Sequence, residues 1–117
     1  MFTDVSRVVR ASALPDSDLE LDPLDPAKVL EGEPEVRVLP LHEAEDLEVG
    51  IWQHGPGVTR DVEYDEVFVV LSGRATIAVE DGPVLEVGPG DVALLRAGSS
   101  ASWTVHETLR KVYVIRP

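Results

Sequence analysis

Residues 57–73 read GVTRDVEYDEVFVVLSG, and residues 88–98 read GPGDVALLRAG. In both stretches, short runs of Val, Leu, Phe and Ala are bounded by Gly, Ser, Pro and Asp. Apolar runs of this length predict strands, and the Gly, Pro and Asp clusters predict tight turns between them. The two stretches therefore predict short antiparallel strands.

The same pattern covers most of the chain. Many short strands at near-regular spacing favour an all-β sandwich or barrel, and 117 residues suit a single domain. No long helical periodicity is present. The predicted strands are residues 47–52, 62–71, 74–79, 84–87, 92–95, 102–105 and 111–115, with turns or loops at 54–57, 81–82, 88–91 and 97–100 and a further loop around His106 and Glu107.

The N-terminal part of the chain differs from the rest. Residues 1–35 are rich in Pro, Asp and Glu, and proline interrupts both helices and central strands. We therefore predict an extended N-terminal arm over residues 1–35, with a short turn near 27–30, and a barrel over residues 36–117. The arm is expected to lie along the barrel or along a neighbouring subunit.

Composition narrows the class of protein. The net charge of −12 argues against nucleic acid as a partner, because phosphate contacts require clustered Lys and Arg. The absence of cysteine excludes disulfides and thiolate metal sites. No apolar run is long enough to span a membrane, and the N-terminus lacks a signal-peptide pattern. These features predict a cytoplasmic protein that does not act at a membrane.

The two opening stretches resemble the paired sequence motifs of cupins. The chain is most similar to small cupins related to ureidoglycine aminohydrolase and to the ethanolamine-utilisation cupin. Gly50-Ile51-Trp52, Trp103 and the closing segment 110–115 carry that closer resemblance. It implies a single-domain double-stranded β-helix, the RmlC-like jelly-roll cupin barrel, with a small-molecule pocket in the barrel lumen.

The resemblance also locates the metal ligands that most cupins use, which are three histidines and a glutamate. Counting from the motif glycines places these positions at Arg60, Val62, Glu66 and Ala101. Only Glu66 keeps a ligand atom, and a single carboxylate does not hold a first-row metal ion tightly. We therefore expect a degenerate metal site, with no metal and no cofactor.

Strand alternation predicts which side chains face the lumen. The predicted ligand-binding residues are Tyr64, Glu66, Phe68, Trp103, Trp52 and Lys111. Glu63 and Asp65 flank Glu66 and are expected to face solvent. Three interpretations of Glu66 stay open: an acid/base or ligand anchor, a structural ion pair with Lys111 or Arg96, or exposure at the barrel mouth. The aromatic residues either contact a ligand or fill the core.

Three functions follow from these alternatives. The first is a metal-free cupin that binds a small-molecule ligand. The second is an enzyme acting on a small nitrogen-containing metabolite, with Glu66 as the catalytic acid/base. The third is a structural subunit whose lumen is filled by its own side chains. Because antiparallel sheets must protect their edge strands, we also expect a homodimer, with the arm pairing to a partner sheet.

Overall fold

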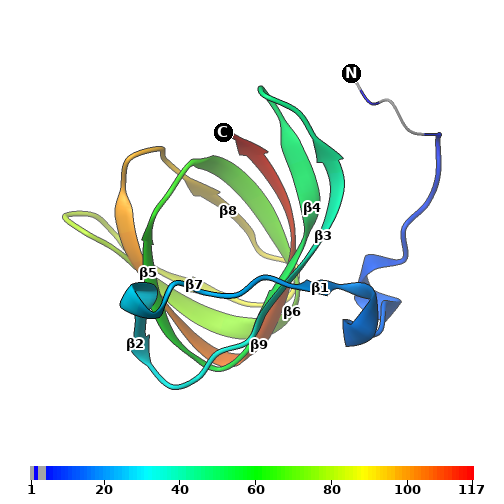
Figure 1. Ribbon diagram of the computed structural model, residues 1–117. Helices are drawn as coiled ribbons and strands as arrows, with labels where there is room; N and C mark the ends of the chain where they lie inside the picture. Colours follow the sequence, from blue (N-terminus) through cyan, green and yellow to red (C-terminus); the bar gives the residue numbers. More distant parts are fainter. Residues whose placement is uncertain (1, 3–4) are drawn as a thin grey trace.

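A computed structural model describes residue 2 and residues 5–117. In this part of the chain, nine strands form one antiparallel sheet that closes on itself as a barrel (Figure 1). The all-β jelly-roll barrel predicted from the sequence is confirmed. The strands are β1 (Glu20–Leu21), β2 (Val29–Glu31), β3 (Val36–Glu43), β4 (Glu48–His54), β5 (Gly57–Val62), β6 (Asp65–Val79), β7 (Val84–Val87), β8 (Val92–Leu95) and β9 (Ser100–Arg116), and three single-turn 3₁₀ helices are η1 (Ala11–Ala13), η2 (Asp16–Asp18) and η3 (Pro26–Lys28).

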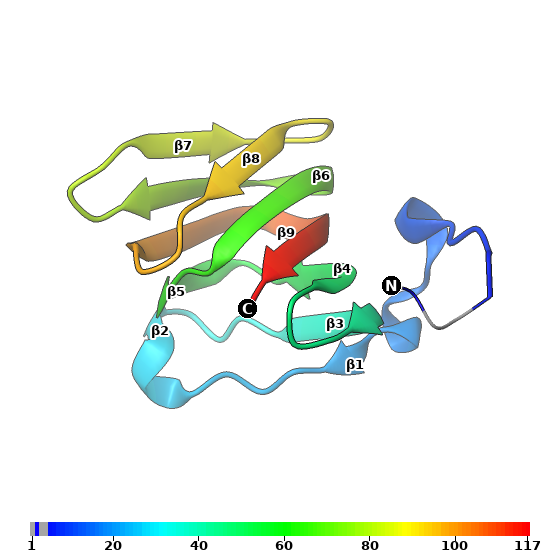
Figure 2. The same ribbon diagram turned by 90° about the horizontal axis from the view of Figure 1, so that it is seen from above.

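Two long strands, β6 and β9, run side by side and hold the barrel together. Along one edge, β9 pairs with β5 through its first half and with β4 through its second half. Along its far edge, β6 pairs with β8 and then with β7. Figure 2 shows the result as two layers, with β7 and β8 in one and β1 and β3 in the other. The lumen lies between these layers.

A bulge in β6 changes which residues face inward. Glu66, Phe68 and Val70 are buried before the bulge, whereas Ala75 and Ile77 are buried after it. Pairing with β9 shifts register between Val70 and Ala75, and an odd number of inserted residues moves every later side chain to the opposite face. Gly73 occupies the bend with φ +86°, where a Cβ atom would clash with the backbone carbonyl of Thr108.

The core of the barrel lies toward the end that β7 closes. Apolar side chains from β6, β7, β8 and β9 meet there, so this end is filled while the other end stays open. The buried cluster consists of Phe68, Val70, Ala75, Ile77, Val87, Ala93, Leu95, Ala101, Trp103, Val105, Leu109 and Tyr113.

A buried arginine fastens the N-terminal arm to the outside of the barrel. Arg110 is 5% exposed, and its guanidinium donates to Oε1 of Gln53 at 2.8 Å. It also donates to the carbonyls of Ala11 and Leu14 at 2.9 and 2.7 Å and to Oδ1 of Asp16 at 3.1 Å. Five fixed donors on one planar group therefore hold η1 and η2 against β4 and β9.

The rest of the arm joins the sheet of its own chain. β1 pairs with β3, and β2 pairs with β5. The predicted turn near residues 27–30 corresponds to η3, where the Asp25 side chain accepts from the backbone N–H of Ala27.

The structure corrects three of the predicted strand boundaries. The break expected between residues 71 and 74 is wrong, because β6 runs unbroken from Asp65 to Val79. The loop expected around His106 and Glu107 is wrong, because β9 runs unbroken from Ser100 to Arg116. The single strand expected over residues 62–71 is also wrong, because β5 ends at Val62 and β6 begins at Asp65. Two residues, Glu63 and Tyr64, therefore lie outside any strand. The predicted strands 84–87 and 92–95 match β7 and β8. Over the described residues, no helix has the length and apolar character needed to cross a membrane.

Candidate functional site

The open end of the barrel encloses a cavity of about 370 Å³. Strands β3, β4, β5, β6 and β9 line it, and η3 and the segment that leads to it border its mouth. The lining combines aromatic rings with several carboxylates, and its residues are Asp22, Leu24, Lys28, Val36, Val38, Pro40, Glu43, Glu48, Trp52, His54, Thr59, Arg60, Asp61, Val62, Glu63, Tyr64, Glu66, Trp103, Lys111, Tyr113 and Ile115.

A buried ion pair lies in the wall of this cavity. Nζ of Lys111 is 2.7 Å from Oε2 of Glu66, and the two side chains are 6% and 5% exposed. The ammonium also lies over three aromatic rings, with its nitrogen 4.3 Å from the centroid of Trp52, 4.4 Å from Phe68 and 4.5 Å from Trp103. Aromatic faces and a carboxylate both attract a cation, so this cage replaces part of the hydration that the ammonium has lost.

The carboxylate of Glu66 keeps unused hydrogen-bonding capacity. Oε2 lies 2.7 Å from the Lys111 ammonium, which is its one neighbouring donor among the described residues, and a carboxylate oxygen has a second lone pair that can accept another. Burial lowers the pKa of Lys111 from its ordinary 10.5, against the attraction of Glu66 and Glu63. Opposite charges therefore hold the pair together, and Oε2 of Glu66 can still accept a hydrogen bond from a further donor.

Glu63 does not face solvent, and the prediction for this residue is wrong. It lines the cavity, and its Oε1 accepts a hydrogen bond from Nε1 of Trp103 at 2.9 Å. Because residues 63 and 64 lie between two strands, the alternation rule does not apply to them. Burial raises the pKa of Glu63 above its ordinary 4.5, and the Trp103 hydrogen bond opposes that shift.

The lumen-facing residues of β5 are also displaced by one from the expected positions. Thr59 is buried and pairs with Trp103, and Asp61 pairs with Ala101, so Thr59 and Asp61 share the inward face. Arg60, which was expected at a metal-ligand position in the lumen, instead extends its guanidinium to Glu80 at 2.6 Å. Asp61 forms an ion pair with Lys28 of η3 at 3.0 Å.

His54 is held rigidly beside the cavity. It is 1% exposed, its Nδ1 lies 2.6 Å from the carbonyl oxygen of Gly55, and its Nε2 lies 2.9 Å from Oγ1 of Thr59. A carbonyl oxygen only accepts, so Nδ1 carries the proton and Nε2 accepts from the threonine hydroxyl. Burial, together with the charge of Lys111, lowers the pKa of His54 from its ordinary 6.5.

The residues predicted to bind a ligand fall in three places. Trp52, Trp103, Glu66 and Lys111 line the cavity directly. Tyr64 stands at the rim and is 57% exposed. Phe68 is 1% exposed and absent from the cavity lining, so it lies beneath the wall and contacts the Lys111 ammonium. The sequence analysis did not select Thr59, Asp61 or Glu63, because only tertiary structure shows that they face inward.

Comparison with known protein families identifies the family of this chain. The family described as EutQ-like cupin domains matches residues 41–113, which is more than half of the chain.

The chain belongs to the EutQ-like cupin family.

Solved structures agree with this assignment. The EutQ protein of Clostridium difficile has a TM-score of 0.65 at 20% identity, covering 82% of this chain and 81% of its own. A putative ethanolamine utilization protein Q of Salmonella typhimurium has a TM-score of 0.62 at 25% identity, covering 71% and 70%. A Pseudomonas syringae protein of unknown function from the DUF861 family has a TM-score of 0.72 at 27% identity, with 83% of this chain matching 43% of that one. Among curated proteins, none matches the chain.

The lumen of this EutQ-like cupin does not suit the metal ion that many cupins hold. Among the described residues, no group of three His, Asp or Glu side chains is arranged to bind a metal. Ala101 has no donor atom, and two of the carboxylates that line the cavity, Asp61 and Glu66, each face a lysine ammonium. Bringing a divalent cation next to Lys111 would oppose like charges in a poorly solvated site. The residues present therefore do not fit a metal centre.

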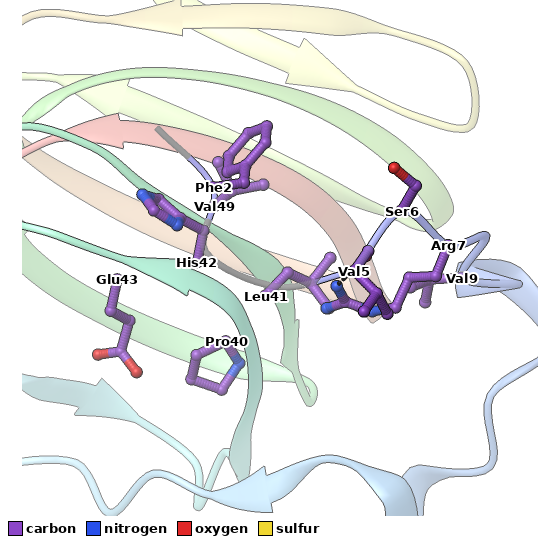
Figure 3. A pocket seen from close by; sticks show the side chains of 10 residues that line it. All are labelled: Phe2, Val5, Ser6, Arg7, Val9, Pro40, Leu41, His42, Glu43 and Val49. Carbon is purple, nitrogen blue, oxygen red and sulfur yellow. Dashed lines mark hydrogen bonds between the residues drawn. The ribbon is translucent and has the colours of Figure 1, made fainter.

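A second hollow of this cupin lies outside the barrel. It has a volume of about 940 Å³ and lies between the N-terminal segment and strands β3 and β4. Figure 3 shows Phe2 beside His42 and Val49, and the Phe2 and His42 rings meet edge to face at 4.8 Å. This hollow is larger, but it holds neither the buried ion pair nor the aromatic cage. We therefore take the lumen as the candidate functional site.

Proposed function

We propose that this EutQ-like cupin binds a small polar molecule in its barrel lumen and does so without a metal ion. The observation that carries the proposal is the Glu66–Lys111 pair in the wall of an open cavity of about 370 Å³. That volume lies within the range of small-molecule sites, roughly 300–1,000 Å³. An ion pair in such a cavity supplies both an acceptor and a donor that can orient a ligand.

The chemistry of the walls supports a ligand that combines an apolar part with hydrogen-bonding groups. The Trp52 and Trp103 rings offer flat apolar surface. Oε2 of Glu66 has only the Lys111 ammonium beside it among the described residues, so its remaining acceptor capacity is open to a ligand. A ligand N–H or O–H group that donates to Glu66 would therefore contribute favourably to the free energy of binding.

A second candidate is the enzyme interpretation, in which Glu66 acts as acid or base on a small nitrogen-containing metabolite. The free capacity of Oε2 favours it, because a catalytic carboxylate must be able to exchange a proton with its substrate. The name of the Salmonella typhimurium relative, an ethanolamine utilization protein, also points to amine chemistry in that protein. The ion pair with Lys111 weighs against it, since Oε2 already faces the lysine ammonium at 2.7 Å and a substrate would have to compete with that contact.

The binding proposal is tested by nuclear magnetic resonance titration. Small compounds bearing hydroxyl, amide or amine groups are added to labelled protein, and the indole N–H signals of Trp52 and Trp103 report entry into the lumen. A Val38→Trp variant adds bulk from β3 to the cavity lining and should abolish the shifts. The matched Val84→Trp variant places the same ring at an exposed position on β7 and should bind normally. Equal responses of the two variants would refute lumen binding.

We also propose that the protein is a homodimer, with a location in the cytosol. The dimer proposal rests on the outer face of β8, β6 and β9, since both arm strands bond to their own barrel. Neighbouring strands stack aliphatic side chains there, and Val69, Val92 and Leu94 are 38%, 60% and 75% exposed. A chain with net charge −12 repels its copies at most other surfaces. This uncharged face is therefore suited to a second copy; its aliphatic residues are Val67, Val69, Val92, Leu94, Val112 and Val114.

A further inference from the structure

We propose that Lys111 is a reactive amine that captures small aldehydes or ketones, forming a reversible imine inside the lumen. The inference rests on the proposed function in one respect, namely that a small molecule can enter the cavity. It adds a chemical class of ligand and a covalent bond, neither of which follows from the fold.

Geometry supports this role first. Lys111 lines the cavity, so a small carbonyl compound bound there lies next to the lysine side chain. The aromatic rings of Trp52 and Trp103 form an apolar surface around the nitrogen and exclude water. The exclusion of water favours imine formation in two ways. It destabilises the charged ammonium relative to the neutral amine, and it slows hydrolysis of the imine.

Glu66 supplies the proton acceptor that the reaction needs. Its Oε2 is 2.7 Å from Nζ, so the ammonium proton can pass directly to the carboxylate. Burial is also the dominant influence on Lys111 and lowers its pKa, which makes the neutral amine more accessible than in an exposed lysine. A carboxylate next to a desolvated lysine is the arrangement that general base activation of an amine requires.

The reaction balances without any further reagent. The ammonium gives one proton to Glu66, and the freed lone pair of Nζ forms a C–N bond to the carbonyl carbon. One of the two protons left on that nitrogen moves to the carbonyl oxygen, which becomes the hydroxyl of a carbinolamine. The C–O bond then breaks, and the hydroxyl leaves as water with the proton returned from Glu66. The products are a protonated imine, paired with the Glu66 carboxylate, and one water molecule, with no change in oxidation state.

The chain contains its own control for this chemistry. It has only two lysines, Lys28 and Lys111. Lys28 is exposed at the mouth of the cavity and forms an ion pair with Asp61, whose hydrogen bond and charge raise the pKa of Lys28. Both lysines have a carboxylate partner at similar distance, so they differ mainly in burial. If a carbonyl compound reacts faster with Lys111 than with Lys28, the difference is therefore due to the environment of the lumen.

The test uses propanal as the probe and sodium cyanoborohydride to reduce any imine to a stable propyl-lysine. The full-length protein is treated near neutral pH, digested and mapped by mass spectrometry, with the N-terminal amine scored separately. We expect Lys111 to be propylated at least about tenfold faster than Lys28, since each unit of pKa changes the free amine about tenfold. In denaturant the two lysines should react equally, because burial is lost.

Two variants complete the design. Lys111→Arg keeps the positive charge but has no amine that forms an imine, so rapid labelling should disappear. Lys28→Arg should leave it intact. Faster labelling of Lys28 than of Lys111 in the folded protein would overturn the inference. If propanal shifts the Trp52 and Trp103 signals but labels neither lysine selectively, only the imine is wrong and lumen binding survives. If the Trp52 and Trp103 signals also stay unchanged, propanal does not enter the lumen, and both the binding proposal for this probe and the imine proposal are wrong.

Discussion

Nζ of Lys111 and Oε2 of Glu66 lie 2.7 Å apart in the barrel lumen, where the two side chains are almost fully buried. Their charges are taken out of water together, and their mutual attraction offsets the cost only while both are present. The ammonium is further surrounded by three aromatic rings, one of which belongs to Trp103. The most deeply buried charges among the described lining residues are therefore those of one pair, Glu66 and Lys111.

Removing one member of this pair should destabilise the fold strongly. Lys111→Met leaves the Glu66 carboxylate buried without a counter-charge, and the free energy of unfolding should fall by about 3–5 kcal/mol. In the double variant Glu66→Leu with Lys111→Met, no unpaired charge is left, so most of that loss should be recovered. Urea denaturation followed by Trp fluorescence measures both. Additive losses in the double variant would mean that the two residues act independently.

We predict that the purified protein carries no stoichiometric transition metal. Lys111 places its ammonium beside Glu66, and the motif position Ala101 offers no ligand atom. Elemental analysis of protein made without an affinity tag, after dialysis, measures the metal content. About one equivalent of metal per chain that disappears in Glu66→Gln would contradict the metal-free proposal and favour the enzyme candidate.

Trp103 should contribute to stability through its volume and through its hydrogen bond. Trp103→Ala removes a side chain that is 5% exposed, and the free energy of unfolding should fall by about 3–5 kcal/mol. Trp103→Phe keeps a ring but removes the N–H that Glu63 accepts, which should cost roughly 1–3 kcal/mol. Thermal and urea denaturation give these values. Unchanged stability with lost ligand binding would instead make Trp103 a ligand contact.

The buried His54 should make stability depend on pH below neutrality. Its pKa in the folded state is lower than the ordinary 6.5, mainly because of burial. As the pH falls below 6.5, the unfolded chain binds a proton that the folded chain does not, so stability is lost until the folded pKa is passed. Above pH 6.5 its contribution is complete.

The His54→Gln variant isolates this effect. Between about pH 7.5 and pH 5, the wild type should lose more of its free energy of unfolding than the variant does, with a slope of up to about 1.4 kcal/mol per pH unit from this one group. Urea denaturation at each pH measures the free energy of unfolding of both proteins. The difference between the two proteins above pH 7 is the reference for the differences at lower pH. Parallel curves for the two proteins would show that His54 does not contribute.

The dimer is tested by light scattering at micromolar concentration. We expect twice the mass of the 12.7 kDa chain. Leu94→Lys places a charge on the aliphatic face of β8 and should shift the protein toward monomer, whereas Val84→Lys, exposed on β7, should not. A wild-type monomer, or equal dimerisation of the two variants, would contradict the proposed interface.

Local sequence patterns were sufficient to predict most of the strands. Alternating apolar residues and turn signals predicted strands 84–87 and 92–95 within the observed bounds, because burial of one sheet face leaves a period-two pattern. The resemblance to cupins supplied the barrel closure. Alternation also selected Trp103, counted from the motif position Ala101, and Trp52 and Lys111, each from the faces of its own strand; all three line the lumen.

Tertiary structure decided the details of the site. Alternation does not reveal where a strand is interrupted, so it placed Glu63 on the wrong face. Counting along the cupin motif placed Arg60 at a metal-ligand position in the lumen, whereas its guanidinium pairs with Glu80. The pairing of Glu66 with Lys111 joins residues far apart in the chain, on strands whose register is fixed by the whole barrel. The sequence by itself therefore determined the barrel and its inward-facing aromatic residues, while the contacts among its charged groups depended on long-range strand register that no local pattern encodes.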